Sequence, residues 1–225
     1  MLWKRLDNVL NTMMRILCLF AFLICAYAVY DGYMVYNQAS NQSILVYKPS
    51  DNGEPSEKGE IEGSVAWLTI DDTTIDYPVM QGIDNAEYIN KDPYGNYSVS
   101  GSIFLDCRNT SDFSDPYSLI YGHHMEHDYM FGALDKFLNK EFFEAHRTGT
   151  LNVKGKVYQI NIFAVVEAPA EEEIIFAPNE SPLSYIKEHA TVKADSFPEE
   201  GKILGMSTCK YPETTDRTIL FGFLN

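Results

Sequence analysis

Short apolar runs separated by turn-forming residues make up most of the chain after Gly63. Each run is rich in Val, Ile, Leu, Phe and Tyr and is bounded by Gly, Asp or Asn, a pattern typical of β-strands. The predicted strands are Val65–Ile70, Thr73–Tyr77, Ser102–Leu105, Ser118–Tyr121, Gly149–Val153, Tyr158–Val166, Ile203–Cys209 and Thr218–Phe223. Because closure removes exposed strand edges, we expect a mainly β fold, an eight-stranded closed barrel with a few peripheral helices.

Two helices are expected between these strands, because apolar residues recur there at helical spacing. One carries Met130, Leu134, Phe137 and Leu138. The other begins at Ser181-Pro182, an N-cap followed by a first-turn proline, and continues to Ala190. A helical turn is also expected from Ile44 to Tyr47. We expect both apolar faces to pack on the core.

The N-terminal part has a different pattern, an uncharged apolar run from Ile16 to Tyr30. Crossing a bilayer takes about 20 residues, a length the run reaches if it extends to neighbouring residues on both sides. Basic residues before the run predict a cytoplasmic N-terminus and an exported remainder. We therefore expect a cytoplasmic tail over 1–12, a transmembrane signal anchor over 13–36, a polar stalk over 37–60 and a globular domain over 61–225. A cleaved signal peptide is the alternative, since Ala26-Tyr27-Ala28 has the form that signal peptidase accepts.

Charge narrows the range of partners. The net charge is −15, and the part after the apolar run holds 14 basic and 31 acidic residues, a net −17. A surface of this sign repels phosphate backbones and anionic lipid headgroups. No nucleic-acid partner is expected, and the membrane contact is expected through the N-terminal helix alone.

The globular part contains two cysteines, Cys107 and Cys209. In an exported domain the two could form a disulfide, an alternative that would make the chain a non-catalytic, membrane-tethered binding module. Their spacing fits no zinc pattern, so neither a metal nor a cofactor is expected.

Cys209 ends one predicted strand and Arg217 directly precedes the next, with the seven residues 210–216 between them. If the two strands pair antiparallel, the two residues lie opposite each other on one face. A fixed positive charge lowers the pKa of a nearby thiol and stabilises the oxyanion that forms when a thiolate attacks a carbonyl. The pair thus predicts a cysteine nucleophile with an arginine oxyanion partner. The connecting loop exceeds ordinary hairpin length, which favours a binding role.

Such a nucleophile needs a general base, and two histidines follow Gly122 at the end of a predicted strand. Side chains alternate along a strand, so His123 and His124 should point to opposite sides and only one should face the cysteine. The pattern alone leaves both open.

Several motifs together resemble the sortases of Gram-positive bacteria, and in detail their class B. The resemblance covers roughly residues 61–225, behind an N-terminal anchor. The motifs are Tyr77-Pro78-Val79-Met80-Gln81, Asp84-Asn85 with Tyr88, Gly101-Ser102-Ile103-Phe104-Leu105-Asp106, Tyr121-Gly122-His123-His124-Met125, Ser207-Thr208-Cys209 and Arg217. The predicted helix near Ser181–Val192 resembles the one that class B carries before its cysteine-bearing strand.

This resemblance implies a sortase-type barrel over 61–225 and a cysteine transpeptidase activity. It assigns catalysis to His123, Cys209 and Arg217. It further implies cleavage of a sorting signal of secreted surface proteins at a Thr–x bond through a thioester, and transfer to a peptidoglycan amine at the outer face of the cell membrane. Ser207 and Thr208 are expected substrate contacts, with ordinary strand packing as the alternative for Thr208. A cysteine endopeptidase that uses water as acceptor is the nearest rival.

Overall fold

The computed structural model describes residues 2–40, 42–178, 180–196, 199–209 and 216–225, with Cys209 described by its backbone. The chain divides into two compact units, Met1–Gln38 and Ala39–Asn225. Helix α1 (Leu2–Ser40) supplies the first unit. By length and composition α1 is apolar enough to cross a membrane, a test that a signal sequence also passes.

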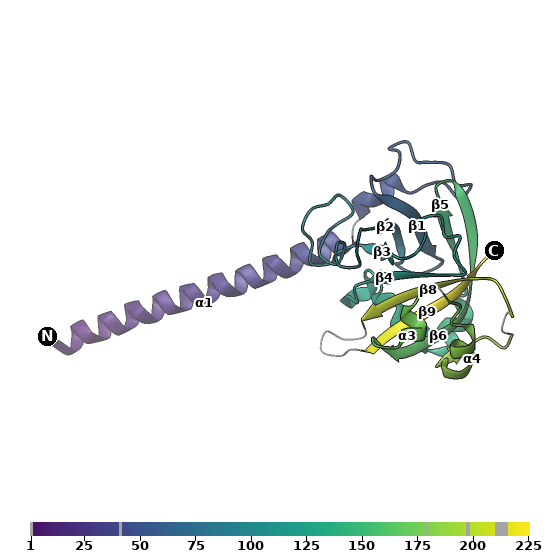
Figure 1. The fold of residues 1–225 in the computed structure, drawn as a ribbon. Coiled ribbons are helices and arrows are strands. Elements are labelled where there is room, and N and C mark those ends of the chain that lie inside the picture. The colour runs from purple at the N-terminus through teal and green to yellow at the C-terminus, as the bar shows by residue number, and fades with distance from the viewer. Residues whose placement is uncertain (1, 41, 179, 197–198, 210–215) are drawn as a thin grey trace. The chain divides into compact units, whose positions relative to one another are not determined.

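The second unit is a closed barrel of eight strands (Figure 1). Its strands are β1 (Ser64–Ile70), β2 (Asp76–Gln81), β3 (Ile103–Leu105), β4 (Tyr117–Gly122), β5 (Thr148–Val153), β6 (Lys156–Pro169), β8 (Lys202–Cys209) and β9 (Asp216–Leu224). Their order is β5-β1-β2-β3-β4-β8-β9-β6, and β6 pairs with β5 to close the circle. The predicted eight-stranded barrel is therefore confirmed, and the two-residue strand β7 (Val192–Lys193) is added beside β6.

Two strand pairs in the barrel are parallel, β2 with β3 and β4 with β8, whereas β8 pairs antiparallel with β9. Since β4 and β8 run in the same direction, their carboxyl ends meet at one end of the barrel. The amino end of β9 lies at the same level, because the β8–β9 register pairs Cys209 with Arg217. The order of the strands thus brings the three ends that carry the predicted catalytic residues side by side.

Large side chains from distant strands fill the core. Tyr117 of β4 and Phe221 of β9 are fully buried, with ring centroids 6.3 Å apart. Gly205 of β8 lies between these strands, and a Cβ atom there would come within 2.7 Å of the Tyr117 hydroxyl oxygen. Overpacking of this kind costs about 1–3 kcal/mol, so the glycine is a packing requirement of the core.

The second predicted strand, Thr73–Tyr77, was placed too early, since β2 covers Asp76–Gln81. Residues 71–74 form a turn in which the Thr73 hydroxyl donates to the Ile70 carbonyl at 2.8 Å and accepts from the Ile75 amide at 3.1 Å. Asp72 has a φ of 56° in the same turn. The β-branched threonines have high strand propensity, but their hydroxyls satisfy a turn here.

The helices are short and lie outside the strand ladder. They are η1 (Gln42–Tyr47), η2 (Glu126–Asp128), η3 (Gly132–Leu138), α2 (Lys140–Ala145), α3 (Glu173–Phe176) and α4 (Leu183–His189). The helical turn at Ile44 to Tyr47 is confirmed. The helix expected around Met130–Leu138 is a 3-10 helix that begins at Gly132, and Met130 has a φ of +51°. Pro182, not Ser181, occupies the N-cap of α4, so that boundary was one residue early.

A second, smaller apolar cluster covers the outside of the barrel near η1. Ile44 of η1 is buried and packs with Trp67 of β1, Met80 of β2 and Phe104 of β3. A segment that precedes the first strand therefore contributes to the packing of the barrel.

Candidate active site

The three predicted catalytic positions lie at the ends of three neighbouring strands, with His123 directly after β4, Cys209 at the end of β8 and Arg217 near the start of β9. The parallel β4–β8 register pairs Gly122, the last residue of β4, with Thr208, and the residues that follow these two in the chain are His123 and Cys209. On the other side of β8, Cys209 pairs with Arg217 of β9. The register therefore places Arg217 directly opposite Cys209, and it places the end of β4, one residue before His123, beside Thr208.

His123 and Arg217 line one pocket with a volume of about 410 Å³. Both are half-buried. The complete lining among the described residues is Asn85, Ile89, Phe104, Tyr121, Gly122, His123, Ala170, Phe176 and Arg217. A mostly apolar pocket with a few polar groups is typical of sites that bind small or extended ligands.

The imidazole of His123 is held by the backbone of the β2–β3 connection. Its Nε2 lies 2.8 Å from the carbonyl oxygen of Ile89. A carbonyl oxygen accepts only, so Nε2 carries a proton in this contact. In the neutral imidazole the lone pair then lies on Nδ1, which is the atom able to take up or release a proton.

The neighbouring imidazole has different surroundings. His124 Nε2 lies 3.0 Å from the Asp135 carboxylate, whose other oxygen accepts from the Thr218 hydroxyl at 3.0 Å. Thr218 is one residue beyond Arg217 and therefore projects from the opposite face of β9. The two histidines thus face opposite sides, as the strand alternation predicted.

Ser207 and Thr208 lie directly before Cys209 on β8 and are fully buried. Neither belongs to the described lining of the pocket. Ser207 pairs with Tyr121 and shares its face, whereas Thr208 pairs with Thr218 and shares the face of Asp135. A contact between a substrate and either residue stays a prediction. The loop expected to bind substrate covers 210–216; its residues 210–215 lie outside the described residues, and Asp216 begins β9.

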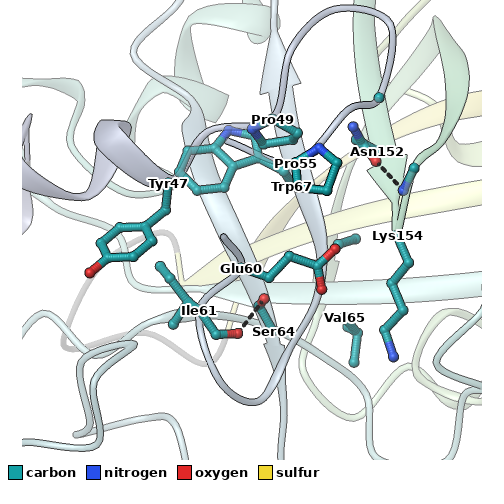
Figure 2. Close-up of a pocket in the computed structure, with 13 residues that line it drawn as sticks. Tyr47, Pro49, Pro55, Glu60, Ile61, Ser64, Val65, Trp67, Asn152 and Lys154 are labelled. Atoms are coloured by element: carbon teal, nitrogen blue, oxygen red, sulfur yellow. Dashed lines mark hydrogen bonds between the residues drawn. The ribbon is translucent and has the colours of Figure 1, made fainter. Parts of the chain in front are cut away.

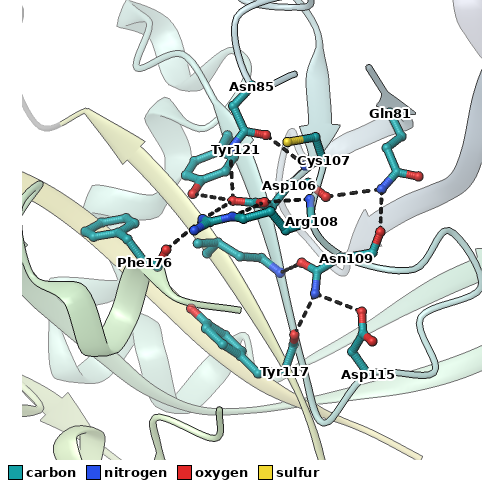
Figure 3. A network of polar contacts seen from close by, with 11 residues as sticks. Gln81, Asn85, Asp106, Cys107, Arg108, Asn109, Asp115, Tyr117, Tyr121 and Phe176 are labelled. Atoms are coloured by element: carbon teal, nitrogen blue, oxygen red, sulfur yellow. Dashed lines mark hydrogen bonds and ion pairs between the residues drawn. The ribbon is translucent and has the colours of Figure 1, made fainter. Parts of the chain in front are cut away.

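Sequence reasoning gave no role to several residues that line the pocket, and a buried carboxylate connects three of them (Figure 3). Asp106, which directly follows β3, is fully buried. Its Oδ2 accepts from Asn85 Nδ2 at 2.9 Å and from the Tyr121 hydroxyl at 3.0 Å. Arg108 forms a bidentate ion pair with the same carboxylate, in which Nε donates to Oδ1 at 2.8 Å and Nη2 donates to Oδ2 at 2.7 Å.

Burial and these hydrogen bonds shift the pKa of Asp106 in opposite directions. Burial alone would raise the pKa of Asp106, but the bonds from Arg108, Tyr121 and Asn85 outweigh it and hold the pKa below its ordinary value. Burial, with the charge of Asp106 adding to it, raises the pKa of the Tyr121 hydroxyl. The carboxylate therefore stays charged and the phenol stays protonated at neutral pH.

Cys107 bears on the disulfide that the sequence left open as an alternative. Cys107 is a free, half-buried cysteine in the structure, which gives no support to a disulfide with Cys209.

A second pocket beside Trp67 and Tyr47 has a volume of about 30 Å³, enough for a water molecule or two but not for a peptide (Figure 2). Neither His123 nor Arg217, the predicted catalytic residues whose side chains the structure describes, lines it. Within the described residues, no group of three or more His, Cys, Asp or Glu side chains is placed to hold a metal ion.

Comparison with known proteins identifies the family. The sortase domain model matches residues 68–225. Sortase B of Listeria monocytogenes is 33% identical over 183 residues, which cover 74% of this chain and 73% of the relative. A crystal structure of a class B sortase of Streptococcus pyogenes involved in pilus biogenesis matches with a TM-score of 0.67 and 40% identity, over 72% of this chain and 92% of that one. A Staphylococcus aureus sortase B–substrate complex matches with a TM-score of 0.67 and 28% identity, over 73% and 81% of the two chains. The chain therefore belongs to the sortase family of cysteine transpeptidases and, within it, to class B.

Proposed function

We propose that this chain cleaves the sorting signal of secreted surface proteins at a Thr–x bond and transfers the acyl part to an amine of the cell wall. The observation that supports the proposal is the pairing of Cys209 with Arg217 in β8 and β9, next to the end of β4, which His123 directly follows. A nucleophile, a proton carrier and an oxyanion partner are the three groups that acyl transfer through a thioester needs.

The first step forms the acyl-enzyme. The Cys209 sulfur attacks the threonine carbonyl, a carbon–sulfur bond forms, and the negative charge on the carbonyl oxygen is held by Arg217. When the carbon–nitrogen bond breaks, His123 gives a proton to the leaving amine. In the second step an incoming amine attacks the thioester, His123 takes its proton, and the Cys209 thiolate leaves. Protons and bonds balance over the two steps without any further reactant.

Arginine suits the oxyanion role because the guanidinium stays protonated and presents donors in a rigid fork. Arg217 lines the pocket beside Tyr121, and its charge is close enough to that phenol to act on its pKa. A lysine would place one mobile point charge there. The arginine side chain thus offers a fixed site for the negative oxygen of the intermediate.

The substrate that we propose is a peptide of Asn-Pro-x-Thr type, and the acceptor is an amine of a peptidoglycan peptide. Both rest on membership of the family rather than on a contact in the pocket. The pocket is large enough for several side chains of an extended peptide, and its apolar lining from Ile89, Phe104 and Phe176 fits apolar parts of such a ligand. Ser207 and Thr208 remain the proposed contacts from β8.

We propose that residues 13–36 anchor the chain in the cell membrane as a single span, with 1–12 in the cytoplasm and the catalytic domain over 61–225 outside. The apolar helix α1 and the basic residues that precede its uncharged stretch support this placement. Immunoblots of membrane and medium fractions test the anchor, since a shorter soluble form in the medium would contradict it.

The activity is tested with a fluorogenic Asn-Pro-x-Thr peptide and an added amine. The wild-type chain should cleave the peptide and yield the ligated product by mass spectrometry, whereas Cys209→Ala should abolish both. Arg217→Lys should lose most of the activity and keep the fold by circular dichroism. Near wild-type turnover in either variant would contradict the assignment. Cleavage without any ligated product would identify an endopeptidase that uses water.

A further inference from the structure

The pocket includes three residues from segments far apart in the sequence, Asn85, Tyr121 and Phe176, which we call the pocket wall. Asn85 lies in the connection between β2 and β3, Tyr121 on β4 and Phe176 at the end of α3. Within the described residues, Asp106 bonds to the first two directly and reaches the third through Arg108. We propose that Asp106, with Arg108, is a positioning residue that fixes the pocket wall for substrate binding.

The amide of Asn85 is held in one orientation. Its Nδ2 donates to the Asp106 carboxylate, which only accepts, and its Oδ1 accepts from the Cys107 amide at 2.8 Å. A flipped amide would place an oxygen against a carboxylate and a nitrogen against an N–H donor. Asn85 therefore presents its second Nδ2 hydrogen in one fixed direction.

Tyr121 is fixed at both its polar and its apolar parts. Its hydroxyl donates to Asp106, and its ring lies close to two other rings. The centroid distance is 5.4 Å to Phe104, at a tilt of 36°, and 6.5 Å to Phe176, in a stacked arrangement at 13°. Removal of the carboxylate would leave the ring to be held by aromatic contacts that are worth about 1 kcal/mol each.

Arg108 connects Asp106 to α3. The guanidinium pairs with the carboxylate, and the same Nη2 donates to the carbonyl oxygen of Phe176 at 2.7 Å. Arg108 is two residues from Asp106 and 68 from Phe176, so this bond joins segments that the chain itself leaves apart. The side chain of Arg108 is 47% exposed, whereas that of Asp106 is fully buried.

Positioning explains a buried carboxylate better than stability does. Transfer of a carboxylate out of water is costly, and apolar replacements of buried ion pairs are often neutral or stabilising. What an apolar residue could not supply is an acceptor that serves three donors from different segments. The network thus fits a site that must hold separate loops in one arrangement.

The inference rests on the proposed function for its substrate, so we test it with two independent readouts on the full-length chain in detergent. The first is hydrogen exchange over 82–89 and 172–177, which needs no substrate. The second readout is the separate measurement of KM and kcat for cleavage of the Asn-Pro-x-Thr peptide. We expect Asp106→Asn to speed exchange in both segments about tenfold, because bonds that limit local opening are lost. KM should rise about tenfold with kcat nearly unchanged, the pattern of lost ground-state binding.

Asp76→Asn is the matched control. The Asp76 carboxylate also accepts from three side chains, Trp67, Thr69 and Lys48, at 2.7–2.9 Å, but it lies outside the pocket lining. The same chemical change there should leave exchange over 82–89 and 172–177, and KM, at wild-type values. Equal effects of Asp106→Asn and Asp76→Asn on exchange and KM would overturn the proposal, since they would indicate that either substitution destabilises the whole domain.

Arg108→Lys keeps the test decisive if Asp106→Asn does not fold. Lysine retains the positive charge but has no guanidinium to join the Asp106 carboxylate to the Phe176 carbonyl. Hydrogen exchange should therefore increase over 172–177, and it should not increase over 82–89, because Asn85 bonds to Asp106 directly. Unchanged exchange in both segments, or increased exchange with unchanged KM, would overturn the role of the network in binding. If the wild-type chain does not cleave the peptide, the proposed function fails, and the exchange pattern still decides whether Asp106 and Arg108 hold the wall.

Discussion

At the scale of single residues, His123 and His124 have different surroundings, and these support His123 as the imidazole that we propose to serve the cysteine. His123 lies in the pocket with Arg217, and its Nε2 donates to a backbone carbonyl. His124 is bound to Asp135 on the other face. A proton carrier must reach the reacting atoms through a hydrogen bond or one water, and we propose His123 for this role because it shares the pocket with Arg217.

Substitution separates the two histidines. We expect His123→Ala to lower kcat/KM by about 100-fold or more, the usual contribution of a general acid–base. His124→Ala should leave kcat/KM close to wild type and lower the free energy of unfolding by about 1 kcal/mol through the lost bond to Asp135. Peptide cleavage and urea unfolding measure the two effects. Equal and mild losses of activity would place the proton carrier elsewhere.

The ion pair of Asp106 predicts a pH dependence of stability. Because the folded state lowers the pKa of this carboxyl, its stabilisation is complete above the ordinary pKa of about 3.9 and is lost as the pH falls through the lower folded value. Asp106→Asn should therefore reduce the free energy of unfolding by about 1–3 kcal/mol at pH 7 and by less at pH 3. Urea unfolding of both chains at the two pH values measures the difference. A constant difference would show that the charge of Asp106 contributes nothing.

Residues of the site differ in how far the sequence predicted them. The pairing of Cys209 with Arg217 follows from two apolar runs around one loop, and the register confirms that pairing. The pocket positions of Asn85 and Phe176 could not be predicted. Each depends on contacts with Asp106 or Arg108 that span 21 and 68 residues, and no local pattern encodes such contacts.

At the scale of elements, the connection between β2 and β3 holds the site through one close approach of the backbone. Gly101 has a φ of +59°, and a Cβ atom there would come within 2.3 Å of the Ile89 carbonyl oxygen. That oxygen accepts from His123 Nε2. The absence of a side chain at Gly101 therefore allows the Ile89 carbonyl oxygen to lie within hydrogen-bond distance of His123 Nε2.

Gly101→Ala tests this relation, with Gly95→Ala as its control. Gly95 also has a positive φ, +85°, but has open space where a Cβ atom would lie. Both changes should cost about 1–2 kcal/mol through backbone strain. Only Gly101→Ala should also displace the Ile89 carbonyl and lower kcat/KM, by about tenfold for one lost hydrogen bond. Equal activities of the two variants would contradict the role of Ile89.

Elements were predictable where the apolar pattern was long and regular, as in β1, β6 and β9. The pattern misplaced β2, because the Thr73 hydroxyl bonds within a turn and the Thr74 hydroxyl donates to the Asp128 carbonyl of η2, although threonine propensity favours strand. It missed α3 (Glu173–Phe176), which has four residues and a single buried one, Ile175. One turn of helix carries too few apolar positions to show a period.

At the scale of the whole molecule, eight turn-bounded runs predicted closure of the barrel but not the order of its strands. The parallel pairing of β4 with β8 joins residues 117–122 to 203–208, across most of the domain. Such a pairing depends on long-range packing, which a single sequence does not reveal. This pairing places Gly122 opposite Thr208, the residues that directly precede His123 and Cys209, so the backbone arrangement at the proposed site is a product of the complete fold.

The intact mass of the chain after incubation with an Asn-Pro-x-Thr peptide tests the central claim most directly. We predict that wild type gains the mass of the peptide minus the released amine, that proteolytic mapping places the gain on Cys209, and that an added amine removes it. Cys209→Ala should show no gain under the same conditions. Release of the amine without any adduct on Cys209, or an equal rate of release by Cys209→Ala, would contradict the account.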